Sequence, residues 1–324
     1  MVGCDNRQNN GGSLDAVNFN SQHLHVVQVG LGTCATIFQN LAGAEGEWDS
    51  MLGWLLESTS EDRPNEIRAV AVEPVAEHVR RLRNRFSGDF PRIALVHSAL
   101  DEFPDSKDEI YVFTEDAYRA AVQSVPLHQK ADVERQLVYL RNMSCVGGIH
   151  PDFKKMRRKI WDRFGVDVAM EAERTDVCTY HQLVEQFNFK GVELLLIDAE
   201  GYDTRILRSV VGYCQTQDCK GSSEWPQVIC CETMGHCDKI DGEGSEDACL
   251  QMLHDFGYNV LMAGGSNTVL VKGSVLDQHL RLQRWIAKHM YCHYCGSTWW
   301  PFSLIKGGKL HCLSAACISK GMTC

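Results

Sequence analysis

The strongest constraint on the fold comes from two short apolar runs that lie far apart in the chain and end in similar ways. His23–Val29 leads into Gly30 and Gly32. Val192–Ile197 leads into the acidic, glycine-containing stretch Asp198–Gly201. The second run is almost continuously apolar, which is typical of a parallel strand buried on both faces. Because ligand-binding residues gather at the carboxyl ends of parallel strands, both stretches are candidates for one shared edge of a sheet.

Further strand and helix patterns alternate along the chain. The other predicted strands are Ile67–Val72, Ile93–Val96, Ile110–Phe113, Val228–Cys231, Asn259–Ala263 and Thr268–Val271, the last two as a hairpin. The predicted helices are Thr33–Leu41, Ala76–Phe86, Ala117–Val125, Ala131–Arg141, a basic helix from Phe153, Thr179–Phe187, Thr204–Val211 and Ala248–Phe256. Alternation of this kind predicts an α/β fold with a mostly parallel, doubly wound sheet.

Composition divides the chain into three parts. Residues 1–20 are polar and rich in glycine and asparagine, and we expect a flexible tail there. Residues 21–275 carry the alternating pattern and are long enough for one large α/β domain. Residues 276–324 contain a helical pattern, Asp277–His289, and then a cysteine-rich stretch. Within the domain, Ala42–Asn65 is interpreted either as a short helix over the sheet edge or as a lid, and Ser144–Pro151 as a loop.

Charge and cysteine content limit the partners. The formal net charge of −10 argues against a nucleic-acid partner, because such affinity comes mainly from neutralised phosphates. Basic clusters at Arg80–Arg85 and Lys154–Arg163 are interpreted as solvated helix faces. No apolar run approaches the roughly 18 residues of a membrane span, so no membrane partner is expected. The 15 cysteines, without a signal-peptide pattern at Met1–Gly12, predict a reducing, cytoplasmic location.

The first glycine turn and the next strand form the pattern of a nucleotide site. Gly30 and Gly32 let the backbone approach a ligand without an intervening Cβ. Glu73 ends the following strand, where a carboxylate accepts hydrogen bonds from ribose hydroxyls. A nicotinamide dinucleotide enzyme uses the same two parts, so this pattern alone does not identify the cofactor.

The chain resembles the FkbM family of methyltransferases in six segments that follow the family's order. They are Val27–Gly32, Val72–Pro74, Val96–Asp101, Thr175–Leu183, Leu195–Gly201 and Val228–Glu232. The resemblance covers residues 24 to 272, and its most specific element is the Asp-x-Glu-Gly stretch at Asp198–Gly201. It implies a Rossmann-like class I methyltransferase fold that uses S-adenosylmethionine.

The resemblance also implies which residues act and on what. The cofactor-binding positions it implies are Gly30, Gly32, Glu73, Ser98, Ala99 and Asp198. Because family members act mostly on hydroxyl groups, it implies O-methylation of a sugar or another small-molecule natural product. A hydroxyl acceptor must lose its proton, so a base near the methyl group is expected. The candidates for that base are Asp198, Glu200, Glu232, His150 and His236.

Three of the candidate bases have a structural alternative, and three positions depart from the family pattern. Glu200 can instead cap the helix after Gly201, and the two histidines can be ordinary loop residues. Gln28 stands where the family has an acidic residue, Cys34 replaces its third glycine, and Leu196 replaces its lysine. Two other functions therefore stay open: a catalytically degenerate methyltransferase fold that serves as an interaction protein, and a nicotinamide-dependent oxidoreductase. An oxidoreductase of this kind would leave Asp198–Gly201 without a role.

The cysteine-rich tail has the spacing of a metal site. Cys292 and Cys295 form a knuckle followed by glycine, and Cys312 and Cys317 form a looser second pair. Four thiolates satisfy tetrahedral zinc, so the tail predicts a closed, structural zinc ribbon. The alternative is that these cysteines fill a small core. Aromatic residues between the two pairs either cover that core or present a surface for a protein partner.

Overall fold

A computed structural model describes residues 24–31, 67–85, 93–104, 109–140, 145–146, 151–189, 191–221, 224–233, 235–264, 267–274, 303–306 and 309–312. The predicted helices Thr33–Leu41 and Asp277–His289 lie outside these residues, as do the tail 1–20 and the segment Ala42–Asn65. None of the described helices is both long enough and apolar enough to cross a membrane.

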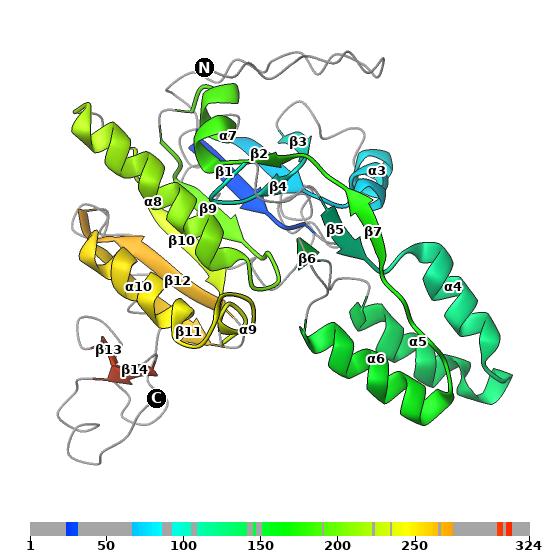
Figure 1. The fold of residues 1–324 in the computed structure, drawn as a ribbon. Coiled ribbons are helices and arrows are strands. Elements are labelled where there is room, and N and C mark those ends of the chain that lie inside the picture. The colour runs from blue at the N-terminus through cyan, green and yellow to red at the C-terminus, as the bar shows by residue number, and fades with distance from the viewer. Residues whose placement is uncertain are drawn as a thin grey trace.

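The domain is built on a seven-stranded sheet (Figure 1). From one edge to the other its strands are β11 (Tyr258–Gly264), β12 (Asn267–Lys272), β10 (Val228–Glu232), β9 (Leu194–Ile197), β1 (Leu24–Val29), β2 (Ile67–Glu73) and β3 (Ile93–His97). Every pairing is parallel except those of β12, which is antiparallel to both neighbours. The predicted mostly parallel α/β sheet and its terminal hairpin are confirmed.

The strand order reverses between β1 and β9. The chain lays β2 and β3 on one side of β1 and then returns to place β9 and β10 on the other. In open α/β sheets, ligands bind outside the carboxyl ends of the strands at such a reversal. All four residues of β9 are buried, as expected for a central strand covered on both faces.

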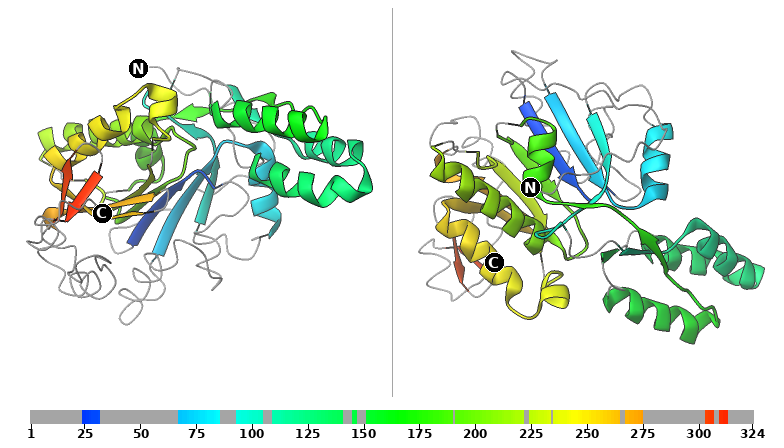
Figure 2. Two further views of the ribbon diagram at one scale, coloured as in Figure 1. Left: turned by 90° about the horizontal axis from the view of Figure 1, so that it is seen from below. Right: turned by 45° about the horizontal axis from the view of Figure 1, so that its top comes forward.

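Three helices cover one face of the sheet: α7 (Tyr180–Gln186), α8 (Asp203–Cys219) and α10 (Ser245–Asp255). Figure 2 shows α8 and α10 side by side on this face. Their buried side chains share one apolar core with alternate residues of β1, β2, β9 and β10. A further helix, α3 (Ala76–Arg85), follows β2 and contacts β2 and β3. This core holds the carboxyl ends of the central strands in fixed positions.

An inserted layer joins the domain between β3 and α7. Its strand β5 (Glu109–Val112) pairs antiparallel with β6 (Cys145–Val146) and β7 (Glu171–Arg174). Its helices are α4 (Glu115–Ser124), α5 (Lys130–Leu140) and α6 (Pro151–Phe164), which enclose a separate core. The strand predicted at Ile110–Phe113 therefore exists, but it pairs in this small sheet and not in the main one.

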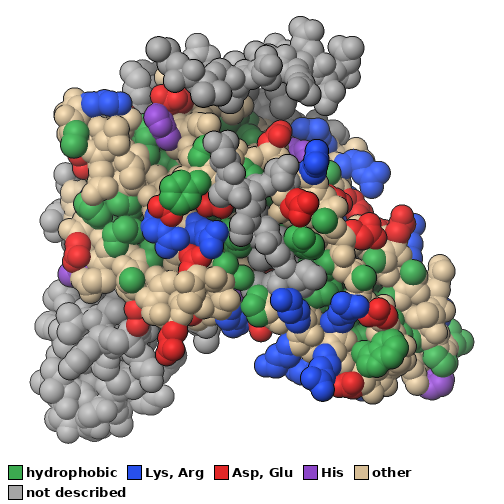
Figure 3. Space-filling view, viewed as in Figure 1, with side chains coloured by type: hydrophobic (Ala, Val, Ile, Leu, Met, Phe, Trp, Pro, Cys, Tyr) green, Lys and Arg blue, Asp and Glu red, His purple; other side chains and the backbone are tan. Residues whose placement is uncertain are grey.

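The inserted layer contacts the main domain at the carboxyl edge of the sheet. Ile110 and Val112 of β5 share a small core with Val75, Ala99 and Tyr202. Farther from the sheet, Lys and Arg side chains gather over α6 (Figure 3). Lys154, Lys155, Arg158 and Lys159 of this helix are exposed, which confirms the interpretation of the second basic cluster as a solvated helix face.

A buried carboxylate ties the short helix α9 (Asp238–Asp241) to α8. The Asp241 carboxylate accepts hydrogen bonds from Thr204 Oγ1 at 2.8 Å, Arg205 Nε at 2.7 Å and Arg208 Nη2 at 3.0 Å. Burial alone would raise the pKa of Asp241, but the hydrogen bonds from Arg205, Arg208 and Thr204 outweigh it, and the pKa is lowered. This network fixes the segment that follows His236.

We expect Asp241→Asn to lower the free energy of unfolding by about 1.5–3 kcal/mol at neutral pH, because Arg205 loses its carboxylate partner and Arg208 keeps only Glu102. Since the folded pKa is depressed, the contribution is complete above the unfolded pKa of about 3.9 and is lost as the pH falls through the folded value. Urea unfolding between pH 7 and pH 3 measures the difference, with the exposed Asp247→Asn as control. An equal difference from wild type at every pH would contradict the network's role.

The tail is described only in part. β13 (Ser303–Lys306) and β14 (Lys309–Cys312) form an antiparallel hairpin in which Cys312 lies opposite Ser303. Cys292, Cys295 and Cys317 lie outside the described residues. The zinc ribbon stays a prediction.

Candidate active site

The first glycine of the predicted pocket lies at the strand reversal. Gly30 has φ +77° and donates its N–H to Val72 O at 3.0 Å, while Asp198 N donates to Val29 O at 2.9 Å. A Cβ on Gly30 would lie 1.7 Å from the backbone oxygen of Asp198. Glycine is therefore required where β1 passes the end of β9, a reason different from the ligand access that we expected. Gly32 lies outside the described residues.

Glu73, predicted to hold a ribose, closes the turn that follows β1. Its side chain is 2% exposed. One carboxylate oxygen accepts from Leu31 N at 2.9 Å, and the other accepts from Val75 N at 2.9 Å and lies 3.1 Å from His78 Nδ1. These contacts hold both carboxylate oxygens at the first turn. Glu73 thus ends β2, as predicted, and its carboxylate contacts the first turn at Leu31. Its role in binding ribose stays a prediction.

Ser98 and Ala99, the other predicted cofactor positions, begin a short link to the inserted layer. Ser98 Oγ lies 2.9 Å from the Asp176 carbonyl oxygen and donates to it. Ala99 belongs to β4 (Ala99–Leu100), which pairs with β8 (Val177–Cys178). Ser98 N also donates to Glu73 O at 3.2 Å. Both residues therefore lie beside Glu73, with the serine hydroxyl engaged by the backbone.

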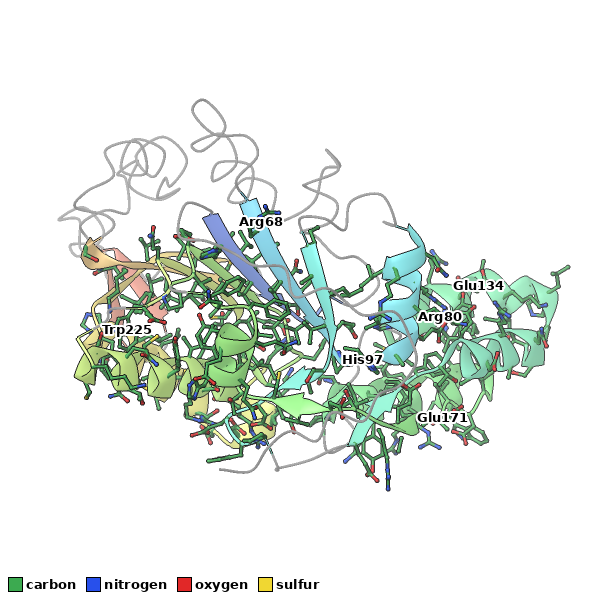
Figure 4. The ribbon with its side chains drawn as sticks, turned by 90° about the horizontal axis from the view of Figure 1, so that it is seen from above. Arg68, Arg80, His97, Glu134, Glu171 and Trp225 are labelled. Atoms are coloured by element: carbon green, nitrogen blue, oxygen red, sulfur yellow. The ribbon has the colours of Figure 1, made fainter. Side chains whose placement is uncertain are left out.

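Figure 4 shows which end of the sheet carries the candidate site. Arg68, near the amino end of β2, and His97, at the carboxyl end of β3, are labelled at opposite ends of the sheet. His97 Nε2 lies 3.1 Å from Pro74 O, so its ring borders the turn after Glu73. The carboxyl ends of β1, β2, β9 and β10 lie on the His97 side because these strands are parallel.

The turn after β9 places a second group of acidic residues at the same edge. Asp198 is exposed and Glu200 half-buried. Glu200 has φ +51° and Gly201 φ +94°, so the chain turns sharply through left-handed backbone. Non-glycine residues in this region carry strain and cluster at functional sites. A Cβ on Gly201 would lie 2.7 Å from the backbone oxygen of His236, so this turn packs directly on the segment after β10.

Asp203 links the two strand ends, a role that the sequence analysis missed. Its side chain is buried, and its two oxygens accept from Glu232 N at 2.9 Å and Ala199 N at 3.2 Å. Burial raises its pKa to about 7, and the charges of Asp198 and Glu232 act in the same direction. An acidic residue in the first turn of the helix after the Asp-x-Glu-Gly stretch was the available signal.

We expect Asp203→Asn to lower the free energy of unfolding by about 1–3 kcal/mol, because an amide nitrogen must then face one of the two buried backbone N–H donors. Asp203→Ala should cost more, since both donors lose their acceptor. Chemical unfolding measures both changes. A loss no larger than that of the exposed Asp247→Asn would show that Asp203 does not bridge the strand ends.

Three of the predicted catalytic residues converge at the ends of β9 and β10. They are Glu200, Glu232 and His236, which can each offer one ligand atom within 4.8 Å of the others. His236 Nδ1 lies 3.0 Å from Glu232 Oε1. Gly235 N donates to Glu246 Oε2 at 2.9 Å, which helps to anchor the segment that carries the histidine. Of the two remaining candidates, Asp198 is exposed at the turn after β9, and His150 lies outside the described residues.

The electrostatics of this cluster are unusual. Burial, together with the charges of the nearby carboxylates Asp198, Glu232 and Asp203, raises the pKa of Glu200 to about 9. Contact with Glu232 raises the pKa of His236 above its ordinary value. A buried carboxyl group and a paired imidazole can exchange protons with a bound hydroxyl, and perturbed pKa values of this kind mark functional sites.

Comparisons with known proteins add little. No protein-family model matches the chain, and no curated protein sequence matches it. A structural comparison finds an O-methyltransferase from Bacillus cereus solved in complex with SAH. The match has 9% sequence identity and a TM-score of 0.28, and covers 76% of this chain and 74% of the other. At that similarity it does not bear on function.

Proposed function

We propose that the protein is an S-adenosylmethionine-dependent methyltransferase of the FkbM type that methylates a hydroxyl group of a sugar or other small molecule. The observation that carries the proposal is the convergence of two groups on one edge of the sheet. The Gly30 turn with Glu73 lies on one side of the strand reversal, and the cluster of Glu200, Glu232 and His236 lies on the other. A cofactor site beside a proton-transfer site is what hydroxyl methylation needs.

Strand order supports a methyltransferase over a dinucleotide enzyme. In chain order the sheet reads 3-2-1-4-5-7-6, with the seventh strand reversed between the fifth and sixth. The dinucleotide-binding order is 3-2-1-4-5-6, without the reversed strand. The reversed strand therefore distinguishes this sheet from the dinucleotide-binding order, which favours the methyltransferase fold that the FkbM resemblance implies. A nicotinamide-dependent oxidoreductase also leaves the acidic cluster without a role.

The described residues fit the ribose end of the cofactor. Glu73 lies at the carboxyl end of β2, and Leu31 N and Val75 N hold its carboxylate at the turn where we propose that the ribose hydroxyls bind. S-adenosylmethionine supplies a methyl group bound to a positively charged sulfur, which makes the carbon strongly electrophilic. The chain's main task is therefore to position the acceptor oxygen in line with that carbon.

The cluster of Glu200, Glu232 and His236 provides groups that can accept the proton of the acceptor hydroxyl. As the acceptor oxygen forms its bond to the methyl carbon, the carbon–sulfur bond breaks and its electron pair stays on sulfur. The hydroxyl proton passes to Glu232 or His236, whose Oε1 and Nδ1 atoms lie 3.0 Å apart. The inserted layer contacts this edge through Ile110 and Val112, and we propose that it shapes the acceptor site.

Acceptor-dependent turnover tests the proposal. The purified chain is incubated with labelled S-adenosylmethionine and panels of sugars and phenolic or aliphatic alcohols, and demethylated cofactor is quantified. We expect at least one hydroxyl acceptor to be methylated, and Glu232→Gln to lower that rate by about 10²–10⁴-fold. The exposed Glu243→Gln controls for the change in charge. A preference for amine or thiol acceptors over every alcohol would contradict O-methylation.

We further propose, on sequence grounds, that Cys292, Cys295, Cys312 and Cys317 bind structural zinc, that the tail can contact a protein partner, and that the protein is cytoplasmic. Metal analysis of the purified full chain tests the first of these. We expect about one equivalent of zinc, lost in Cys292→Ser with Cys295→Ser. Unchanged zinc content in this double variant would contradict the assignment of these ligands.

A further inference from the structure

We propose that Glu200, Glu232 and His236 bind a divalent cation of the Mn²⁺ class at the carboxyl ends of β9 and β10. Cation binding stands on the geometry of these side chains alone. Its role, to hold the acceptor hydroxyl next to the methyl donor, rests on the function proposed above.

The three side chains are already grouped for a single ion. Their ligand atoms lie within 4.8 Å of one another, and atoms that share one cation are separated by roughly 3–4 Å. Small side-chain rotations therefore bring all three to coordination distance. The backbone needs no change, because Gly201 packs against His236 O and Asp203 joins Ala199 to Glu232.

Glu232 provides an independent indication that a ligand is missing. The residue is 9% exposed, and within the described part of the chain its Oε2 atom is buried without a hydrogen-bond partner. Its Oε1 atom lies 3.0 Å from His236 Nδ1. A buried carboxylate oxygen without a partner costs free energy, and a cation bound by Oε2, with Glu200 and His236, removes that cost.

The surrounding charge also favours a cation. Asp198 and Asp203 lie close enough to Glu200 and Glu232 to interact with them electrostatically. The nearby Lys239 is paired with Asp152, its Nζ 2.6 Å from the carboxylate. A divalent ion at the three ligands offsets the mutual repulsion of these acidic groups.

The ligand types select the class of ion. Two carboxylates and one imidazole form a mainly hard donor set, which suits Mn²⁺ and related ions. The four cysteines of the tail are soft donors, which favour zinc. Three protein ligands leave coordination positions for water and for an acceptor oxygen. Coordination would lower the pKa of a bound hydroxyl. Because Glu232 and His236 would then serve as ligands, the hydroxyl proton would pass to water, and not to these side chains as in the metal-free step proposed above.

Mn²⁺ binding tests this inference without any assay of activity. The full-length protein is treated with a chelator and titrated with Mn²⁺, and free Mn²⁺ is followed by electron paramagnetic resonance. We expect one bound ion per chain with a dissociation constant in the micromolar range. Glu232→Gln and His236→Gln should each weaken binding at least tenfold, and the exposed Glu243→Gln should leave it within twofold.

Two further measurements distinguish a failure of the metal proposal from a failure of the proposed function. Circular dichroism shows whether each variant is folded, and titration with S-adenosylmethionine shows whether the cofactor binds. Saturable Mn²⁺ binding that is lost in folded Glu232→Gln supports the metal site even if the wild type binds no S-adenosylmethionine, in which case the proposed function fails alone. If the wild type binds S-adenosylmethionine but not Mn²⁺, the metal proposal is overturned and the function stands. Binding that is equally tight in wild type and in both ligand variants also overturns it.

Discussion

Gly30→Ala is expected to destabilise the protein by at least about 3 kcal/mol. The left-handed backbone at φ +77° costs an alanine about 1 kcal/mol. The larger part comes from the new Cβ, which would lie 1.7 Å from Asp198 O and force β1 and β9 apart. Since both halves of the candidate site meet at this crossing, we also expect the variant to lose affinity for S-adenosylmethionine.

Gly165→Ala is the matched control for this substitution. Gly165 has φ +68°, but no atom lies within 4 Å of the Cβ position. It therefore carries the backbone cost of about 1 kcal/mol without the steric overlap. Urea unfolding of the two variants measures the difference between them. If both lose the same stability, the close passage of β1 and β9 does not require glycine.

Glu73→Ala should have the other large effect, on both binding and stability. Removal of the carboxylate leaves Leu31 N and Val75 N without an acceptor, which costs about 2–4 kcal/mol of stability. It also removes the group proposed to accept ribose hydroxyls. Charge-assisted hydrogen bonds of this kind contribute about 1.5–3 kcal/mol each, so we expect S-adenosylmethionine affinity to fall about 100-fold.

Binding in each variant is measured by the rise in the thermal unfolding temperature that S-adenosylmethionine produces. Glu73→Gln retains the shape of the side chain and limits the structural damage. Glu193→Gln is its control, because Glu193 Oε2 accepts from His25 N at 2.6 Å but lies at the amino end of the sheet. The stabilising shift should be lost in Glu73→Gln and kept in Glu193→Gln. Retention in both variants would remove Glu73 from the cofactor site.

The main sheet could be predicted because its strands carry strong local signals. The apolar run that contains Leu194–Ile197 reflects burial on both faces, and the terminal hairpin follows from two neighbouring strand patterns. The partners of β5 could not be predicted. Three of its four residues, Ile110–Val112, are apolar. Such a short run does not indicate whether it joins the main sheet or pairs with two distant strands.

The sequence was enough to predict where the residues of the candidate site lie, but not which of them contact one another. Asp198, Glu200 and Glu232 follow strand patterns, so their place at the carboxyl edge follows from the sequence. The contact of Glu232 with His236 and the bridge through Asp203 depend on how the segments after β9 and β10 pack. The reason for Gly30 was also hidden, since the passing backbone of Asp198 comes from a remote part of the chain.

The register of β1 and β9 relates two of the positions at which the chain differs from the FkbM pattern that it resembles. Gln28 and Leu196 are paired on β1 and β9 and are both buried. An acidic residue at the first position and a lysine at the second, as in the family, would lie beside each other and compensate in charge. The chain replaces both with uncharged residues, so no unpaired charge is buried there. The two replacements are thus compatible with an intact strand reversal.

Calorimetric titration of the wild-type protein with S-adenosylmethionine tests the central claim most directly, with NAD as the parallel ligand. The account predicts saturable binding of S-adenosylmethionine at one site per chain, with a dissociation constant in the micromolar range, and no binding of NAD. Binding of NAD without S-adenosylmethionine would contradict it and favour an oxidoreductase. Binding of neither ligand would also contradict it and favour a fold that has lost its cofactor.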